Sequence, residues 1–153
     1  MRQQGKISPL DAHLGYWLRF VSNQVSHAFS LKLAARDVTV AEWVVLRELF
    51  ERDEMVPSTL AEKLGMSRGA VSKLADRLAA KALLTQTVNP GDRRFQALAL
   101  TGQGRALVPD LAALADANDA EFFGHLDAAE RARIEGAMRE IVRRHGLRTV
   151  PVE

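Results

Sequence analysis

The chain has no cysteine among its 153 residues, and this absence removes three kinds of site at once. Disulfides, zinc sites built from thiolates and thiol-based redox sensing all require cysteine. No apolar run approaches the roughly 18 residues of a membrane-spanning helix. The polar first residues, Met-Arg-Gln-Gln-Gly-Lys, lack the pattern of a signal peptide. We therefore expect a cytoplasmic protein that does not contact a membrane.

The composition is that of an ordinary globular domain, but its charge is unevenly distributed. Hydrophobic residues make up 47% of the chain and charged residues 26%, with a net charge of only +2. The segment 63–105 contains two acidic residues, Asp76 and Asp92, against eight basic ones. These are Lys63, Arg68, Lys73, Arg77, Lys81, Arg93, Arg94 and Arg105. Such a basic segment is typical of a nucleic-acid-binding surface, although basic residues also occur on any solvated surface.

Residues 57–76 have the spacing of a helix-turn-helix motif. A small residue, Ala61, falls where two crossing helices must touch, and Gly65 falls where the chain must turn between them. The apolar positions of the motif are Leu60, Leu64, Met66, Val71 and Leu74. In proteins with this motif the second helix enters the DNA major groove. The spacing therefore predicts a DNA-reading helix that begins near Arg68.

Apolar periodicity predicts helices on both sides of this motif. The first covers 8–36, with Ser8 as its cap and Pro9 in its first turn. The second begins at Thr39 or Ala41 and ends at about Arg52. Helices over 102–124 and 127–145 follow the motif, with caps at Thr101 and Asp127.

Within the central region the pattern predicts two short helices and a hairpin. The helices cover 58–64 and 68–81. Thr59 with Glu62 fits a capping box for the first, and Ser67 fits the N-cap of the second. Strands are expected over 83–88 and 94–100, joined by a turn at 89–92. The fold class is therefore a mostly α winged helix-turn-helix, with a small β-hairpin as the wing.

The long terminal helices suggest a second copy of the chain. Isolated amphipathic helices must bury their apolar stripes, and those of 8–36 and 102–148 are long relative to the core they could cover. We expect the chain, 1–153, to be a single unit in which these helices form a dimerisation region and 39–100 form the DNA-binding region. A two-fold dimer suits a pseudo-palindromic operator in double-stranded DNA.

A helical wheel divides the reading helix into a buried and an exposed face. Val71, Leu74 and Leu78 define the buried face. The candidate DNA contacts are Ser67, Arg68, Gly69, Ser72, Lys73 and Arg77. Arg68 could make a bidentate contact to guanine, and Gly69 allows close approach of the DNA. We expect the Asp76 carboxylate to pair with Lys73 or Arg77. The alternatives are that Ser67 serves only as an N-cap and that Arg77 is a solvated charge.

The turn of the wing contains a second group of candidate DNA contacts. Asp92 could accept a hydrogen bond from an arginine two residues further on, which would brace the tip. Arg93 or Arg94 would then enter the minor groove, whose negative potential attracts arginine. The alternative is a solvated hairpin tip with a local ion pair of little energetic value.

In this order of parts the chain resembles the MarR family of multiple-antibiotic-resistance regulators over nearly its whole length. The residues that carry the resemblance are Leu60-Ala61, Gly65-Met66-Ser67, Val71-Ser72, Leu74-Ala75-Asp76-Arg77-Leu78, Asp92-Arg93-Arg94 and Leu100-Thr101-Gly102-Gln103-Gly104. One departure is Ala82, where the family commonly has glycine. The resemblance implies a homodimer that represses nearby genes. It also implies release from DNA by a small aromatic or anionic effector, bound between the dimerisation and DNA-binding parts.

Candidate effector contacts are few. They are His13, Tyr16, Trp17, Arg19 and Trp43. The two tryptophans lie on apolar stripes, so an ordinary core position is the alternative for both. The four histidines show no metal-ligand spacing, and we predict neither a metal site nor a cofactor.

Two other functions are weighed against a DNA-binding repressor. A winged helix could act as a protein–protein adaptor without DNA, but the basic segment 63–105 and the arginines of the wing argue against this. An enzyme would need a nucleophile with a base, a phosphate loop or a metal-ligand cluster, and none of these patterns is present. The chain is therefore predicted to have no catalytic residues.

Overall fold

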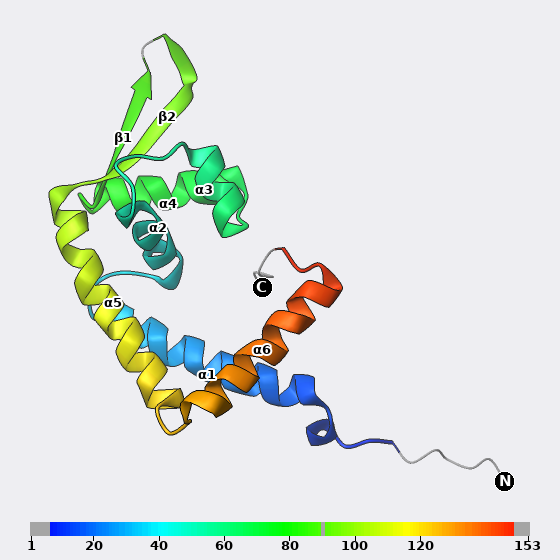
Figure 1. Cartoon of the computed structure of the whole chain (residues 1–153). Coiled ribbons are helices and arrows are strands. Elements are labelled where there is room, and N and C mark those ends of the chain that lie inside the picture. Colours follow the sequence, from blue (N-terminus) through cyan, green and yellow to red (C-terminus); the bar gives the residue numbers. More distant parts are fainter. Residues whose placement is uncertain (1–6, 90, 149–153) are drawn as a thin grey trace.

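The computed structural model of the chain describes residues 7–89 and 91–148, with the backbone alone described at Asn89 and at residues 92–96 (Figure 1). The elements in chain order are the 3-10 helix η1 (Leu10–Ala12), α1 (Leu14–Ala34), α2 (Val40–Phe50), α3 (Pro57–Leu64), α4 (Arg68–Ala80), β1 (Leu84–Asn89), β2 (Asp92–Leu100), α5 (Gly102–Phe123) and α6 (Ala128–His145). The predicted fold class, a mostly helical chain with one antiparallel hairpin, is confirmed. Within the described residues no helix is both long enough and apolar enough to span a membrane.

The central part, from α2 to β2, is built around one apolar core. Leu46, Leu60, Val71 and Leu78 are fully buried, and they come from α2, α3 and α4. The hairpin pairs Leu84 with Leu100 and Gln86 with Leu98. Met55 extends this sheet, because its backbone exchanges two hydrogen bonds of 2.8 Å with Leu98. Each helix of this part therefore has its apolar side covered within one copy of the chain.

Side-chain caps fix the starts of most helices where the sequence predicts them. The hydroxyls of Thr39, Ser67 and Thr101 accept hydrogen bonds from backbone N–H groups three residues further on, at 3.0–3.1 Å. Asp127 forms a reciprocal capping box with Glu130 at the start of α6. These caps satisfy N–H groups that the first turn of a helix leaves without partners.

Two predicted helix caps are wrong. No capping box forms between Thr59 and Glu62, because α3 begins earlier, at Pro57, whose fixed φ suits the first helical position. Ser8 does not cap α1. Instead Pro9 precedes the short η1, and α1 begins only at Leu14, with His13 in extended conformation before it.

Helix α5 packs against the connection between α4 and β1. A Cβ atom on Gly104 would overlap the carbonyl oxygen of Leu83, so only glycine allows this approach. In the same connection Ala82 has a φ of 59°, in the left-handed region that favours glycine. The departure at Ala82 therefore leaves the turn intact, with an alanine in a strained backbone conformation.

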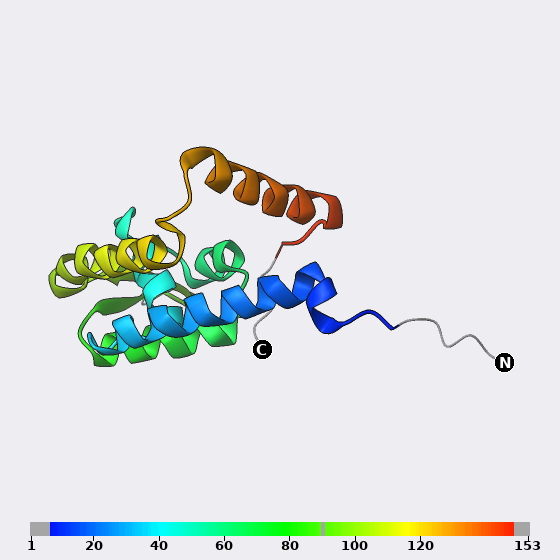
Figure 2. The same cartoon turned by 90° about the horizontal axis from the view of Figure 1, so that it is seen from below.

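The terminal helices form an open arrangement. Helices α1 and α5 pack together at one end, where Leu33, Val108 and Leu111 are buried. A polar cluster lies further along this contact, where Lys32 donates to the Asn118 side chain at 3.1 Å and to Glu121 at 2.6 Å. Helix α6 turns back and stands apart from α1, as Figure 2 shows. It contains no buried residue.

Candidate DNA-binding surface

The reading helix α4 has the two faces that the sequence predicts. Ser67 caps it, and its buried side consists of Val71, Leu74, Ala75 and Leu78. The exposed side contains Arg68, Gly69, Ser72, Lys73, Asp76 and Arg77. No atom lies within 4 Å of the position that a Cβ on Gly69 would occupy. The backbone at this first turn is therefore open to a large partner.

The basic residues of segment 63–105 divide into two groups. Lys63 pairs with Glu48 at 3.5 Å, Lys81 pairs with Glu42 at 2.9 Å, and Arg105 donates to the carbonyls of Phe50 and Arg52. These three cations hold the fold together. In contrast, Arg68, Lys73 and Arg77 form no ion pair or hydrogen bond through their side chains within the described part of the chain. The side chains of Arg93 and Arg94 are not described, so among the described cations of this segment the unpaired ones lie on one helix.

Lys73 and Arg77 also line an open groove beside the reading helix. The groove has a volume of about 530 Å³ and runs between α4, the turn before it and the first turn of α2. Its other linings include Ser67, Met66 and Ala41. Charged donors and a capped helix terminus therefore face the same open space, which suits an elongated anionic partner.

The predicted partner of Asp76 is wrong. Its carboxylate accepts a hydrogen bond from the Gln86 side chain, with 3.0 Å between Nε2 and Oδ1, and forms no ion pair with Lys73 or Arg77. Gln86 lies on the same face of β1 as the buried Leu84, so its amide is directed toward α4. Asp76 therefore connects the reading helix to the wing.

The hairpin extends away from the helices, as Figure 1 shows. Strand β2 begins at Asp92. The side chains of Asp92, Arg93 and Arg94 lie outside the described residues, so their predicted contacts with each other and with the minor groove stay predictions.

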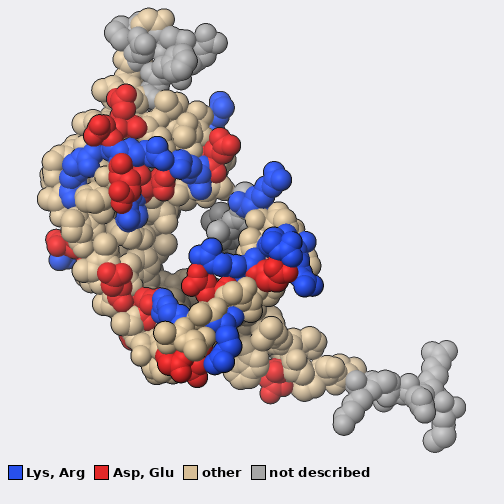
Figure 3. All heavy atoms as spheres, viewed as in Figure 1, with Lys and Arg blue, Asp and Glu red and all other residues tan. Residues whose placement is uncertain are grey.

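Charge on the opposite side of the molecule is mixed. Figure 3 shows acidic and basic side chains interspersed over the winged part, on the face that carries α6. Helix α4 lies on the other side, as the two ribbon views agree. Helix α4 and the dimerisation candidate α6 therefore lie on opposite sides of the molecule.

The candidate effector residues fall into two places. Around the start of α1, Tyr16 and Trp17 meet edge to face with ring centroids 5.3 Å apart, and the Trp17 indole donates to the Asp11 carbonyl at 2.9 Å. His13 and Arg19 are exposed on the same part of the chain. Trp43 instead packs against Phe29 at 6.4 Å. Because α1 rises 1.5 Å per residue, about 18 Å of helix separates Trp17 from Phe29.

The structure therefore does not bring Trp43 together with the other four candidates within one copy, and the effector site stays a prediction. Trp17 is 51% exposed, which is incompatible with a core position in the single chain. Trp43 is half-buried against the core. The described residues include no group of three or more potential metal ligands.

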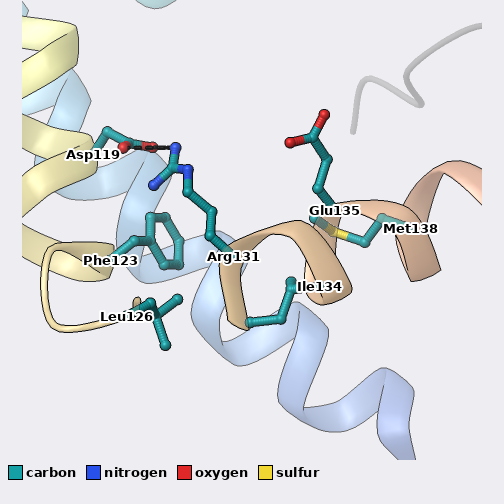
Figure 4. A pocket seen from close by; sticks show the side chains of 7 residues that line it. All are labelled: Asp119, Phe123, Leu126, Arg131, Ile134, Glu135 and Met138. Atoms are coloured by element: carbon teal, nitrogen blue, oxygen red, sulfur yellow. Dashed lines mark hydrogen bonds and ion pairs between the residues drawn. The ribbon is translucent and has the colours of Figure 1, made fainter. Parts of the chain in front are cut away.

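An apolar cavity lies between the end of α5 and the start of α6. Figure 4 shows Phe123, Leu126 and Ile134 around it, with Arg131 directed across to Asp119. The Arg131–Asp119 distance is 2.8 Å, and the cavity volume is about 260 Å³.

Further along α6, hydrogen bonds from Arg143 and Arg144 lower the pKa of the exposed Glu140 carboxyl.

The capped helix with three unpaired cations, next to a β-hairpin, defines a winged helix-turn-helix DNA-binding protein. Comparison with known proteins agrees, because a model of the MarR family matches residues 36–94. Over these residues the chain is similar to the MarR family of transcription regulators.

Three relatives illustrate the similarity. The transcriptional repressor MdtR of Bacillus subtilis is 39% identical over 67 residues, which cover 44% of this chain and 43% of MdtR. The structure of BpsR from Bordetella bronchiseptica, described as regulated in its DNA binding by 6-hydroxynicotinic acid, is 26% identical with a TM-score of 0.77. That match covers 89% of this chain and 97% of BpsR. A mutant of Escherichia coli MarR complexed with operator DNA is 25% identical with a TM-score of 0.75, covering 84% and 93%.

Sequence reasoning missed the residues that hold the reading helix in place. Gln86 had no pattern that distinguished it from other strand residues. Lys81 and Arg105 were counted only as part of the basic segment. The acidic Glu42, at 1% exposed, could have been noticed because it stands among the apolar residues of the first turn of α2. A charge in such a position requires a partner.

Proposed function

We propose that the protein is a homodimeric, sequence-specific DNA-binding repressor in the cytoplasm, with no catalytic role. The observation that supports this function most directly is the set of unpaired cations on α4. Arg68, next to the N-cap, is assigned to base edges in the major groove, and Lys73 and Arg77 to phosphates. Ser67, Gly69 and Ser72 are assigned to close backbone contact. Asp92, Arg93 and Arg94 are assigned from the sequence to the wing contact.

The second copy is proposed to bind the exposed apolar sides of α1 and α6. On α1, Leu14, Trp17, Leu18 and Val21 are 43–69% exposed. On α6, Ile134, Met138, Ile141 and Val142 are 42–47% exposed. Such continuous apolar surface on a helix indicates a protein interface. Helices 8–36 and 102–148 are therefore proposed as the dimerisation region, which would place two reading helices on one operator.

A small aromatic or anionic effector is proposed to control the dimer shape. The BpsR relative, whose DNA binding is described as regulated by 6-hydroxynicotinic acid, supports this chemistry. An effector can act only if it binds the DNA-competent and DNA-incompetent shapes with different affinities. Aromatic carboxylates, including 6-hydroxynicotinic acid, are the probes to screen by thermal shift, because a ligand specific for the folded state raises Tm.

Selection from a randomised duplex library tests the DNA-binding function. The enriched sites should contain an inverted repeat, and the affinity for them should fall steeply with salt as counterions are released. The absence of enrichment, with no binding even at low salt, would instead favour a protein–protein adaptor.

Substitutions test the assigned face. Arg68→Ala should weaken binding by about 1–3 kcal/mol and relax the preference at one base pair. Lys73→Ala should weaken binding to all sequences and reduce the salt slope by about one. The matched control is Arg47→Ala, which removes an exposed cation of α2 paired with Glu51 at 2.9 Å. Equal affinities for all three variants would remove α4 from the DNA interface.

A further inference from the structure

One lysine joins three elements at the far end of the reading helix. Lys81 is the C-cap residue of α4, directly after its last residue, Ala80. Its ammonium donates to the Glu42 carboxylate of α2 at 2.9 Å and to the backbone carbonyl of Asp37 at 2.6 Å. Asp37 lies in the turn between α1 and α2, so the ammonium connects the end of α1, the start of α2 and the end of α4.

The acidic partner in this cluster cannot be satisfied by water. Glu42 is 1% exposed, whereas the Lys81 side chain is 28% exposed. A buried carboxylate is strongly unfavourable unless a cation and hydrogen bonds compensate it. Lys81 supplies both, and no other ion pair to Glu42 occurs among the described residues. The position of Glu42 in α2 therefore depends on the Lys81 ammonium.

The backbone at both ends of the connection is in an unusual conformation. Asp37 has a φ of 55° and Ala82, directly after Lys81, has a φ of 59°. These are the two non-glycine residues with positive φ in the described chain. Such conformations persist where surrounding contacts determine them. The Lys81 hydrogen bond to the Asp37 carbonyl lies between the two strained positions and holds them together.

We propose that Lys81 is a positioning residue for DNA binding, which fixes the angle of α4 relative to α1 and α2 without contacting DNA. The proposal rests on the proposed function of α4 as the reading helix. Lys81 stands thirteen residues beyond Arg68, so about 20 Å of helix separates it from the end that reads bases. Because α1 belongs to the proposed dimerisation region, the same contact ties the dimer arrangement to the direction of each reading helix.

The test compares DNA affinity with stability in matched variants. Lys81→Met removes the ammonium and keeps the aliphatic stem. Arg47→Met removes one cation from an exposed pair, and Val108→Ala destabilises the buried core of α5 without removing a contact of the Lys81 ammonium. All affinities are measured on the selected operator, at a temperature where circular dichroism shows every variant folded.

We expect Lys81→Met to lose about tenfold or more in operator affinity, because a small misorientation of bound groups is costly. Its salt slope should equal that of the wild type, because no phosphate contact is lost. Val108→Ala and Arg47→Met should stay within about twofold of the wild type, because neither change touches the contacts that orient α4. Equal affinity for Lys81→Met and Val108→Ala would overturn the proposal. A salt slope reduced by about one would also overturn it, since Lys81 would then be a direct phosphate contact.

Two further measurements keep the proposal testable. If Lys81→Met does not fold, Glu42→Gln replaces it in the test, because the amide removes the negative charge and retains a hydrogen-bond acceptor. An operator affinity of Glu42→Gln equal to that of the wild type would count against the proposal. Hydrogen exchange should increase together in residues 33–40 and 76–83 of Lys81→Met. If the wild type binds no DNA, the proposed function fails, and unchanged exchange in these two segments would independently reject the positioning role.

Discussion

The winged part, from α2 to β2, and the helical arms, α1 and α6, differ in how completely one copy of the chain buries their apolar side chains. From α2 to β2 most large apolar side chains are buried, α2 and α4 begin at side-chain caps, and the buried Glu42 carboxylate is paired with Lys81. On α6 and on residues 14–21 of α1 the large apolar side chains remain about half exposed. The comparison teaches that one copy completes the core of the winged part, whereas α1 and α6 are proposed to complete theirs against a second copy.

The largest effect on stability is expected when an apolar side chain is shortened to alanine. The winged part and the arms should respond to this change differently. Leu78→Ala removes a fully buried side chain of α4 and should destabilise the protein by about 2–5 kcal/mol at any protein concentration. Ile134→Ala, at a half-exposed position of α6, should have an effect that grows with protein concentration as the dimer forms. Urea unfolding at two protein concentrations distinguishes them. A concentration-independent loss in both variants would contradict the comparison.

A charge placed on the arm should separate the copies. Met138→Asp introduces a carboxylate into the half-exposed apolar side of α6, and its burial in an interface without a partner is strongly unfavourable. Sedimentation should show a shift from dimer to monomer, accompanied by loss of operator binding. Ala132→Asp adds the same charge to an exposed position of α6 outside that apolar stripe and should leave the dimer intact. Dimers of equal strength in both variants would exclude α6 from the interface.

Relief of backbone strain should stabilise the winged part without changing the arms. Ala82→Gly replaces an alanine at positive φ with the residue that adopts this conformation most readily. We expect a gain of about 1 kcal/mol in the free energy of unfolding, less the added entropy of the unfolded chain. Ala80→Gly, inside the helix at the end of α4, is the control and should destabilise. Thermal unfolding measures both.

The smallest effect concerns the link between the reading helix and the wing. Gln86→Ala removes the amide that donates to Asp76 and should cost about 0.5–1.5 kcal/mol of stability. Thr85→Ala, on the exposed face of the same strand, is the control. Operator affinity should fall in Gln86→Ala more than in Thr85→Ala. Identical affinities would show that the wing keeps its direction without this hydrogen bond.

The sequence predicted the fold well because its signals are local. Apolar spacing placed the helices, and the hydroxyls of Ser67 and Thr101 marked helix starts that the structure confirms. The same rules failed at Thr59 and Ser8. A proline at the first helical position took over from the capping box in α3, and a short 3-10 turn displaced the start of α1.

The candidate site was predictable in part, for a physical reason. The exposed face of α4 follows from helical periodicity, so its residues could be named before the structure was known. The partners of Asp76, Glu42 and Lys81 depend on which distant segments meet, and periodicity contains no information about such contacts. The candidate effector residues lie in two separate places in one copy, so a site built from them is harder still to derive from one chain.

The ion pair of Arg131 with Asp119 bears on which proteins can assemble with this one. It borders an apolar cavity next to the exposed side of α6. Apolar stripes attract any similar helix, so they discriminate poorly among related chains. A charged pair at the edge of such a surface disfavours partners that would cover it without supplying matching polar groups.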